Sequence, residues 1–397
     1  MSRSDDYAME RKYLKDRNLH IIFSITLIAV MGVSSVTPAF PAIRESLGLS
    51  NQQVGWLITF FSGPGIVLTP LLGVLADRYG RKTVLIPSLL LYSLAGFGCF
   101  FTRDFEVLLL LRFLQGSGAA ALGSLNITLV GDIYPSNERA KVMGINASVL
   151  SIGTASYPAI GGALSLLGWH YPFLLPLLGI PVAVAVFLGL DNPEPQSHRK
   201  FLSYMKATLK SINRPEVIVI FIASFVVFVI LFGGFLTYFP LLMDAKFSSD
   251  SFIIGLLMTS MSGFTAIVSS QLGPINKLIP ESRLIHFGFL GYALSFALIP
   301  IIQAPLWMLV PIALFGIGHG INFPSIQTRL TLLSSLEYRG AFMSLNGMVL
   351  RAGQAFGPPI VAWFSTFGGI NVAFWITGSL AFITFIFALI FIKPQKG

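Results

Sequence analysis

Three basic side chains lie inside long apolar stretches of the chain, where each would have unusual chemistry. Arg112, His319 and Arg351 are each flanked on both sides by uncharged residues. A charged or titratable group in an apolar environment is costly, so we expect each to face a partner, a substrate or a water-filled cavity. The arginines could neutralise an anion. His319 could carry a proton, since histidine exchanges protons near neutral pH.

Carboxylates are missing from the middle of the same stretches, and Asp132 and Glu216 lie only at their ends. The charge inside the apolar segments is therefore positive, which favours an anionic, zwitterionic or neutral amphiphilic ligand. Two alternatives remain open. Arg112 could extend to lipid headgroups, and His319 could be a packed polar residue.

The composition indicates a membrane protein. Of the 397 residues, 54% are hydrophobic and only 11% are charged, a balance that excludes an ordinary soluble domain. Cys99 is the only cysteine, which excludes disulfides within the chain and cysteine-rich metal sites. The sequence also lacks metal-ligand spacings and a phosphate-binding glycine loop, so we expect no metal, no cofactor and no enzymatic activity.

Charged and turn residues divide the chain into about twelve apolar segments long enough to cross a bilayer as helices. They are placed near residues 19–43, 54–72, 83–101, 106–130, 142–165, 170–190, 216–242, 252–272, 284–302, 305–331, 341–365 and 370–392. Basic residues concentrate on one side of these segments, which predicts cytoplasmic termini in a multi-pass protein of the cell (inner) membrane. The net charge of +9 then faces anionic lipid, and nucleic acid is not an expected partner.

A charged turn with the sequence GVLADRYGRK joins the second and third apolar segments. Its pattern Gly-x-Leu-Ala-Asp-Arg-x-Gly-Arg-Lys resembles the signature loop of the major facilitator superfamily of secondary transporters. The residues that carry the resemblance are Gly73, Asp77, Arg78, Gly80, Arg81 and Lys82. The resemblance implies an all-α polytopic fold with twelve transmembrane helices in two six-helix bundles.

The same resemblance implies an inner gate. In the superfamily the signature loop contacts an acid at the inner end of the fourth helix, which here is Asp132, followed by Arg139. Such a cluster is expected to form when the inner gate is closed and to separate when it opens, as a two-state switch. The alternative is that these are solvated charges of the inner face.

Two further patterns resemble motifs of this superfamily. Arg112, Gln115, Gly116 and Gly118 resemble the fourth-helix motif associated with proton-coupled exchange. Residues of the fifth segment resemble the fifth-helix motif of the exporter branch, and residues of the eleventh segment resemble its counterpart. They are Gly153, Pro158, Gly161 and Gly162 in the fifth segment, and Gly353, Gly357 and Pro358 in the eleventh. Tyr157 stands where that family motif has a glycine. Small residues allow helices to approach closely, so packing alone could also explain the pattern.

The chain repeats itself with a shift of 200 residues, from Gly55 to Gly255, from Gly116 to Gly316 and from Pro158 to Pro358. Two bundles related by a parallel repeat place the substrate between them near the middle of the membrane. We therefore expect a bundle over 1–190, a cytoplasmic linker with an amphipathic helix over 191–215, and a second bundle over 216–397. The charged turn is kept poorly in the second copy, where Asp77 is matched by Lys277 and Arg81 by Glu281.

These features predict a monomeric, proton-linked antiporter that exports a small amphiphilic compound, of the multidrug or metabolite efflux type, by alternating access. Helix depth and spacing predict its substrate-binding residues to be Arg112, Asn126, Tyr157, Tyr238, His319, Asn322, Arg351 and Gln354. Arg112 and His319 are the expected proton-coupling residues. The closest alternative is a carrier for an organic or lipid-like anion that uses Arg112 and Arg351 as counter-charges. An integral membrane enzyme and a non-transporting sensor on a transporter fold are the others.

Overall fold

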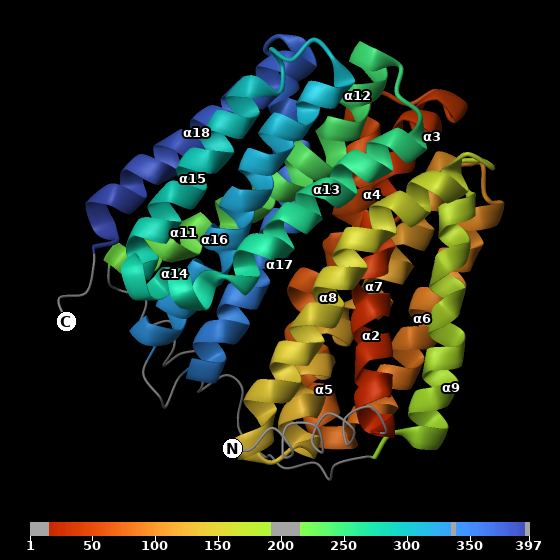
Figure 1. Cartoon of the computed structure of the whole chain (residues 1–397). Helices are drawn as coiled ribbons and strands as arrows, with labels where there is room; N and C mark the ends of the chain where they lie inside the picture. Colours follow the sequence, from red (N-terminus) through yellow and green to blue (C-terminus); the bar gives the residue numbers. More distant parts are fainter. Residues whose placement is uncertain (1–15, 192–214, 335–338, 394–397) are drawn as a thin grey trace.

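The computed structural model describes residues 16–191, 215–334 and 339–393, and within them all regular structure is helical (Figure 1). The linker helix predicted over 191–215 falls almost wholly outside the described residues. We use the name inner face for the face that holds the beginning of the first described helix, at Arg17, and the end of the last, at Phe391. The opposite face is the outer face.

The first group of helices runs from Arg17 to Gly189. Its elements are α2 (Arg17–Ser34), η1 (Thr37–Ala39), α3 (Phe40–Ser46), α4 (Asn51–Ser62), α5 (Pro64–Tyr79), α6 (Arg81–Phe101), α7 (Phe105–Ile133), α8 (Ser136–Ser165), η2 (Tyr171–Leu178) and α9 (Gly179–Gly189). Local sequence sets several of the boundaries. Ser50 and Gln53 form a capping box that starts α4, and the Asp104 side chain caps α7. Gly80 separates α5 from α6 with a φ of 95°, a conformation that favours glycine.

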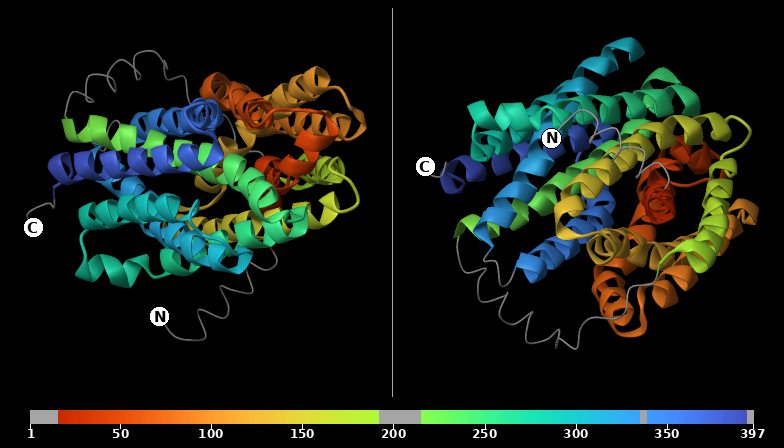
Figure 2. Two further views of the ribbon diagram at one scale, coloured as in Figure 1. Left: turned by 90° about the horizontal axis from the view of Figure 1, so that it is seen from above. Right: turned by 60° about the horizontal axis from the view of Figure 1, so that its bottom comes forward.

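The second group runs from Pro215 to Phe391. Its elements are α11 (Pro215–Phe228), the π-helical η3 (Val229–Tyr238), α12 (Phe239–Phe247), α13 (Ser251–Ser270), α14 (Leu272–Leu278), α15 (Glu281–Leu298), η4 (Pro305–Met308), α16 (Leu309–Leu333), α17 (Arg339–Ser365) and α18 (Gly369–Phe391). In both views of Figure 2 this group, coloured green to blue, lies mostly on the opposite side of the molecule from the first, coloured red to yellow.

Nine helical stretches of the described residues are long and apolar enough to cross a membrane. The other three predicted spans correspond to α8, α15 and α17, which have 30, 18 and 27 residues but more polar sequences. Long helices that are apolar on their exposed sides are typical of a polytopic membrane protein. The expected all-α membrane fold is confirmed.

The 200-residue repeat reappears as matching contacts in the two groups. A Cβ added to Gly116 would lie 1.8 Å from the carbonyl oxygen of Phe61, and one added to Gly316 would lie 2.6 Å from that of Met261, its counterpart. Hydrogen bonds also match: Thr69 donates to the Ala120 carbonyl at 3.0 Å, and Ser269 to the Gly320 carbonyl at 3.0 Å. Each copy therefore packs its second helix on its fourth in the same way.

The two groups meet through α8 against α13 and through α4 and α5 against α17. Here the repeat produces a reciprocal contact. A Cβ on Gly255 would lie 2.3 Å from the Pro158 carbonyl, and one on Gly55 would lie 3.1 Å from the Pro358 side chain. The backbones can approach this closely because both positions lack a side chain.

The other small residues of the two motifs also mark close helix contacts. Gly153 packs on α2 and Gly161 on the Ser35 carbonyl, while Gly162 contacts Ser251 at the start of α13. Gly353 packs on α11, and Gly357 packs on Gly233 in η3. The packing role predicted for these glycines agrees with their positions.

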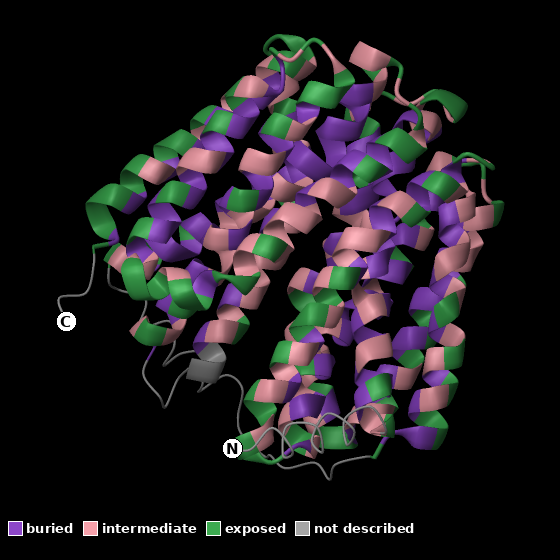
Figure 3. Ribbon diagram, viewed as in Figure 1, coloured by how far each residue is buried: buried purple, intermediate pink, exposed green. Residues whose placement is uncertain are grey.

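The groups separate toward the inner face. In Figure 1 the helices of the two groups meet at the outer end and diverge at the end where α2 begins and α18 ends. Figure 3 shows buried residues inside each group and where the groups meet. A Cβ added at inner-half positions of four helices, at Gly73, Gly131, Gly273 or Gly347, would have no neighbour within 4 Å. The described helices of the two groups are therefore in contact toward the outer face and diverge toward the inner face.

Candidate transport pathway and gates

Arg351 lies where the two groups of helices meet in the middle of the molecule. From α17 its side chain crosses to the first group, where Cδ and Nε would lie 3.2 and 3.3 Å from a Cβ on Gly65 of α5. One terminal nitrogen, Nη2, would lie 3.9 Å from a Cβ on Gly123 of α7. Two helix positions without side chains thus make room for the guanidinium.

Gln354 follows Arg351 by three residues and shares its side of the helix. Like Arg351 it is half-buried. Next to it, the Thr59 hydroxyl of α4 donates to the carbonyl of Ala355 at 2.8 Å. The predicted site residues Arg351 and Gln354 therefore lie at the contact between the groups.

Hydrogen bonds between the groups close the molecule on the outer side of Arg351. Besides the Thr59 bond, Ala159 N–H donates to the Thr259 hydroxyl at 3.2 Å, and Ser262 donates to the Thr154 carbonyl at 3.1 Å. An ion pair contributes at the outer face, where Arg44 of α3 pairs with Asp244 of α12 at 2.9 Å, and Arg44 also donates a hydrogen bond to Asn51 at 2.8 Å. Arg44 and Asp244 are related by the 200-residue shift.

His319 lies inside the second group rather than between the groups. Its Nδ1 is 2.7 Å from the Tyr292 hydroxyl of α15. Its ring stacks nearly parallel to those of Phe315 and Phe323, with centroids 6.2 and 5.8 Å away. Among the described residues, the imidazole thus has a polar partner on α15 and two stacked aromatic neighbours on its own helix, α16.

Arg112 does not contribute to the central site and does not reach lipid headgroups. Its side chain is 1% exposed inside the first group. Nε donates to the Leu57 carbonyl at 3.2 Å, Nη1 donates to the Gly32 carbonyl at 2.9 Å and to Gln115 at 2.7 Å, and the guanidinium lies over the Phe61 ring. The interpretation of Arg112 as a substrate counter-charge is therefore wrong for this conformation, because its donors bind carbonyl oxygens of α2 and α4.

Four other predicted substrate residues are buried within one group or the other. Asn126 bonds Thr26, which in turn donates to Asn146 at 2.6 Å, so the three side chains tie α2, α7 and α8 together. Asn322 packs on Gly288 of α15. Tyr157 and Tyr238 are 8% and 1% exposed, the latter beside Ser365. The contacts of these residues within their own group therefore differ from the predicted position between the groups.

The inner gate cluster of Asp77, Arg81 and Asp132 is present. Arg81 Nε donates to Asp132 at 2.8 Å, and Arg81 also pairs with Asp77. Arg78 lies outside these pairs, with its guanidinium 5.3 Å from the Tyr79 ring centre, and Arg139 Nε donates to the Tyr134 carbonyl at 2.8 Å. The contact that the resemblance implied between the charged turn and the fourth helix is therefore formed.

The behaviour expected of this cluster needs a correction. All three residues belong to the first group, on α5, α6 and α7, and the pairs are intact although the groups are apart at the inner face. The cluster therefore does not have to separate when the inner side opens, because both sides of the pair move as one body.

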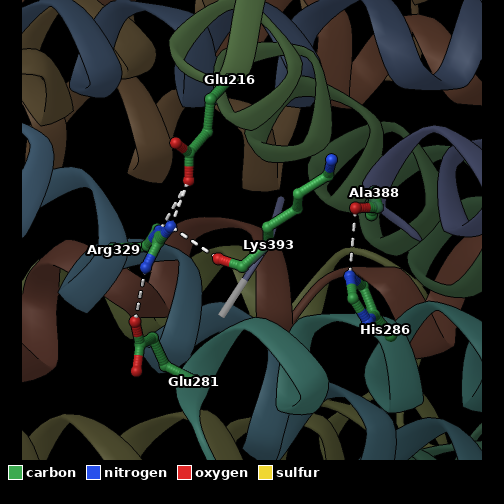
Figure 4. Close-up of polar contacts among 6 residues, drawn as sticks. All are labelled: Glu216, Glu281, His286, Arg329, Ala388 and Lys393. Carbon is green, nitrogen blue, oxygen red and sulfur yellow. Dashed lines mark hydrogen bonds and ion pairs between the residues drawn. The ribbon is translucent and has the colours of Figure 1, made fainter. Parts of the chain in front are cut away.

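A second inner cluster lies in the other group and was not predicted. Arg329 of α16 bonds Glu216 of α11 and, at 2.8 Å, Glu281 of α15, and donates to the Lys393 carbonyl after α18 at 2.9 Å (Figure 4). Nearby, His286 Nε2 is 3.0 Å from the Ala388 carbonyl. The chemistry of the turn is thus not lost in the second copy but reversed in sign, since Glu281 occupies the position equivalent to Arg81.

The comparisons with known proteins agree with this geometry. The sequence model of the Major Facilitator Superfamily matches residues 22–328 and, in a second match, residues 242–397. The chain belongs to this superfamily of membrane transporters.

The chain is also similar to individual transport proteins and to solved structures. The chain is 28% identical to multidrug resistance protein 1 of Bacillus subtilis over 357 residues, covering 89% of this chain and 90% of that protein. It is 24% identical to the bacillibactin exporter of the same organism over 395 residues, covering 96% and 97%. Among solved structures, a bacterial homologue of the human lysosomal transporter Spinster in an inward-facing, unoccupied conformation superposes with a TM-score of 0.78 at 16% identity, covering 96% and 99%.

Proposed function

We propose that this protein is a proton-linked antiporter of the cell membrane that exports a small amphiphilic compound by alternating access. The observation that carries the proposal is the arrangement of the two groups, which are joined by contacts from the outer face to Arg351 and whose helices diverge toward the inner face (Figure 1). Such a molecule can receive a substrate from the inner side. It can release the substrate on the outer side when the inner ends of the groups come together and the outer ends separate. The exporters among its relatives support the direction.

The proposal divides the chain into a bundle over 1–190, a cytoplasmic linker over 191–215 and a bundle over 216–397, with both termini in the cytoplasm. The bundles rock as rigid bodies of one monomer. The ion pairs of Arg81 keep the inner end of the first bundle rigid, and those of Arg329 do the same in the second. When the inner side closes, the charged turn, Gly73 to Lys82, determines how closely the first bundle approaches the second.

His319 is the proposed proton carrier. Its bond to Tyr292 gives it a polar partner in an otherwise aromatic setting, and histidine exchanges protons near neutral pH. Protonation would place a further cation within α16 of the second bundle. Binding of the proton and movement of the bundles are coupled if the two conformations solvate this cation differently.

The test is efflux of a panel of cationic, neutral and anionic fluorescent dyes from energised cells. Wild type should lower the intracellular dye level in a manner abolished by a protonophore. Asp77→Asn should reduce the rate, and His319→Phe should abolish the dependence on the proton gradient. Glu106→Gln, an exposed substitution in the first turn of α7, is the control and should behave as wild type. Absence of protonophore-sensitive efflux for every dye, with the protein correctly inserted, would contradict the proposal.

A further inference from the structure

The charge around Arg351 is not balanced by the protein. The described acidic groups are engaged elsewhere or lie near the faces: Asp244 pairs at the outer face, and Asp77, Asp132, Glu216 and Glu281 pair at the inner face. None of the described residues forms an ion pair or a hydrogen bond with the Arg351 side chain. Arg351 therefore differs from Arg112, whose Nε and Nη1 donate to carbonyl oxygens of Leu57, Gly32 and the Gln115 side chain.

Arg351 also lies next to the innermost hydrogen bond found between α4 and α17 among the described residues. On its outer side the next turn of α17 is held to α4 by the Thr59 bond to Ala355. On its inner side, one turn away on the same side of α17, a Cβ at Gly347 would meet no atom within 4 Å. The guanidinium is thus at the boundary between packed and open regions, where a molecule entering from the inner face would end.

A guanidinium has five donors in a rigid planar fork that matches the two oxygens of a carboxylate. On one side the guanidinium lies beside Gly65 and Gly123, which have no side chain that could accept a hydrogen bond from it. A cation that is half-buried and unpaired is costly in a membrane protein. An incoming carboxylate would offset that cost, whereas an incoming cation would increase it.

We infer that Arg351 is the anion-binding residue of the central site and that the transported amphiphile carries a carboxylate. The inference rests on the proposed transport function and names the charge of its substrate. The apolar part of the amphiphile lies toward the inner opening and its carboxylate is bound to the guanidinium between α5, α7 and α17. Arg351 contacts the first bundle from the second, so the bound ligand touches both bundles at once.

The test measures binding of three fluorescent probes that share one ring system: pyrenebutanoate, its neutral amide and pyrenebutylammonium. Purified full-length protein in nanodiscs of zwitterionic lipid is titrated by fluorescence anisotropy, and empty nanodiscs provide the blank. Wild type should bind pyrenebutanoate at least about tenfold more tightly than the amide or the ammonium probe, a difference of about 1.4 kcal/mol.

Arg351→Gln should remove the preference for the carboxylate and leave binding of the neutral amide unchanged. Arg351→Lys should keep part of the preference, because the charge remains but the planar fork does not. Arg103→Gln, which changes an arginine of the outer turn that bonds only to nearby backbone carbonyls and lies over Trp169, is the matched control and should behave as wild type.

A second variant covers the case in which Arg351→Gln does not fold. Gly65→Val keeps the charge but places methyl groups against Cδ and Nε of Arg351, so it should weaken carboxylate binding selectively. Gly144→Val, at an exposed position of α8 with no neighbour within 4 Å of its Cβ position, is its control.

Wild type without a carboxylate preference, including no binding of any probe, overturns the inference. So does an Arg351→Gln protein that keeps the preference. These results are distinguishable from failure of the transport function. Protonophore-sensitive dye efflux without carboxylate preference leaves an exporter with a different substrate class, and carboxylate preference without efflux leaves an anion-binding protein that is not an exporter.

Discussion

The two arginines in the apolar segments show how the surroundings decide the role of a side chain. Arg112 donates to the carbonyls of Gly32 and Leu57 and to Gln115, and is closed off by the Phe61 ring. Buried donors that are satisfied in this way stabilise one arrangement of the helices. Arg351 has no such partners among the described residues and lies against Gly65 and Gly123. The first is therefore a structural group, and the second is available to a ligand.

Arg329 is the most strongly bound of the inner-face arginines, and its removal should destabilise the second bundle. Arg329→Gln leaves Glu216 and Glu281 without their common cation. Breaking a buried pair costs about 3–5 kcal/mol, and less here because both carboxylates are partly exposed. We expect a lower midpoint of thermal unfolding in detergent, compared at one scan rate because such unfolding is commonly irreversible. Glu281→Gln should lower the unfolding midpoint less than Arg329→Gln does, because Arg329 remains paired with Glu216. Equal midpoints for wild type and Arg329→Gln would contradict this assignment.

His170, in the outer turn before η2, should make stability depend on pH. Burial, followed by the charge of Arg103, lowers the pKa of His170, which lies among the rings of Phe100, Trp169 and Tyr171. A lowered pKa means that the folded state binds fewer protons than the unfolded state, so this contribution is present above the unfolded pKa of about 6.5 and is lost as pH falls below it.

The check on His170 is the difference between two pH profiles of the unfolding midpoint. Wild type minus His170→Phe should decline as pH falls below about 6.5. A constant difference across that range would show that His170 does not titrate in this way.

At the scale of helices, the reciprocal contacts of Gly55 with Pro358 and of Gly255 with Pro158 hold the two bundles together. Because they arise from equivalent positions of a repeat, the bundles meet through a nearly symmetric surface. A surface of this kind is suited to rocking, since small residues permit close approach without interlocking side chains.

Gly255→Val should disrupt that contact. Its Cβ alone would lie 2.3 Å from the Pro158 carbonyl oxygen, and backbone cannot move away cheaply. Overpacking of this type costs about 1–3 kcal/mol, and we expect dye efflux to fall with it. Gly263→Val lies on the same helix, where a Cβ meets nothing within 4 Å, and serves as the matched control. The contact is unimportant if both variants transport equally.

Helices and their order could be predicted because apolar length, capping residues and the 200-residue repeat are local or periodic signals. Asp77, Arg81 and Asp132 could be placed together through the signature loop. Arg351 stood out because a guanidinium in an apolar segment is rare.

Other side chains could not be placed, because sequence gives the depth of a residue but not its rotation. Asn126 and Asn322 contact residues of their own bundle. The Arg44–Asp244 and Arg329 pairs were missed since each joins segments far apart in sequence, and neither residue pair carries a motif.

At the scale of the whole molecule, Arg44 and Asp244 join the bundles at the outer face, and the pair has to break when that face opens. Arg44→Gln should therefore shift the population toward an open outer side. Exchange of the charges, Arg44→Asp with Asp244→Arg, should restore the closed population. The measurement is the distance between spin labels at Leu167 and Leu306, exposed residues of the outer turns, on a Cys99→Ser background. An unchanged distance distribution in Arg44→Gln would show that the pair does not hold the outer side closed.

Alternating access is the central claim, and one pair of distance measurements tests it most directly. Spin labels at Tyr79 and Leu278, exposed at the inner ends of α5 and α14, report the inner side, and labels at Leu167 and Leu306 report the outer side. Both pairs are measured in nanodiscs at about pH 5 and about pH 8, on either side of histidine titration. The account predicts that the inner distance shortens under the condition in which the outer distance lengthens. Distances that stay constant in both pairs, or that change together, would contradict it.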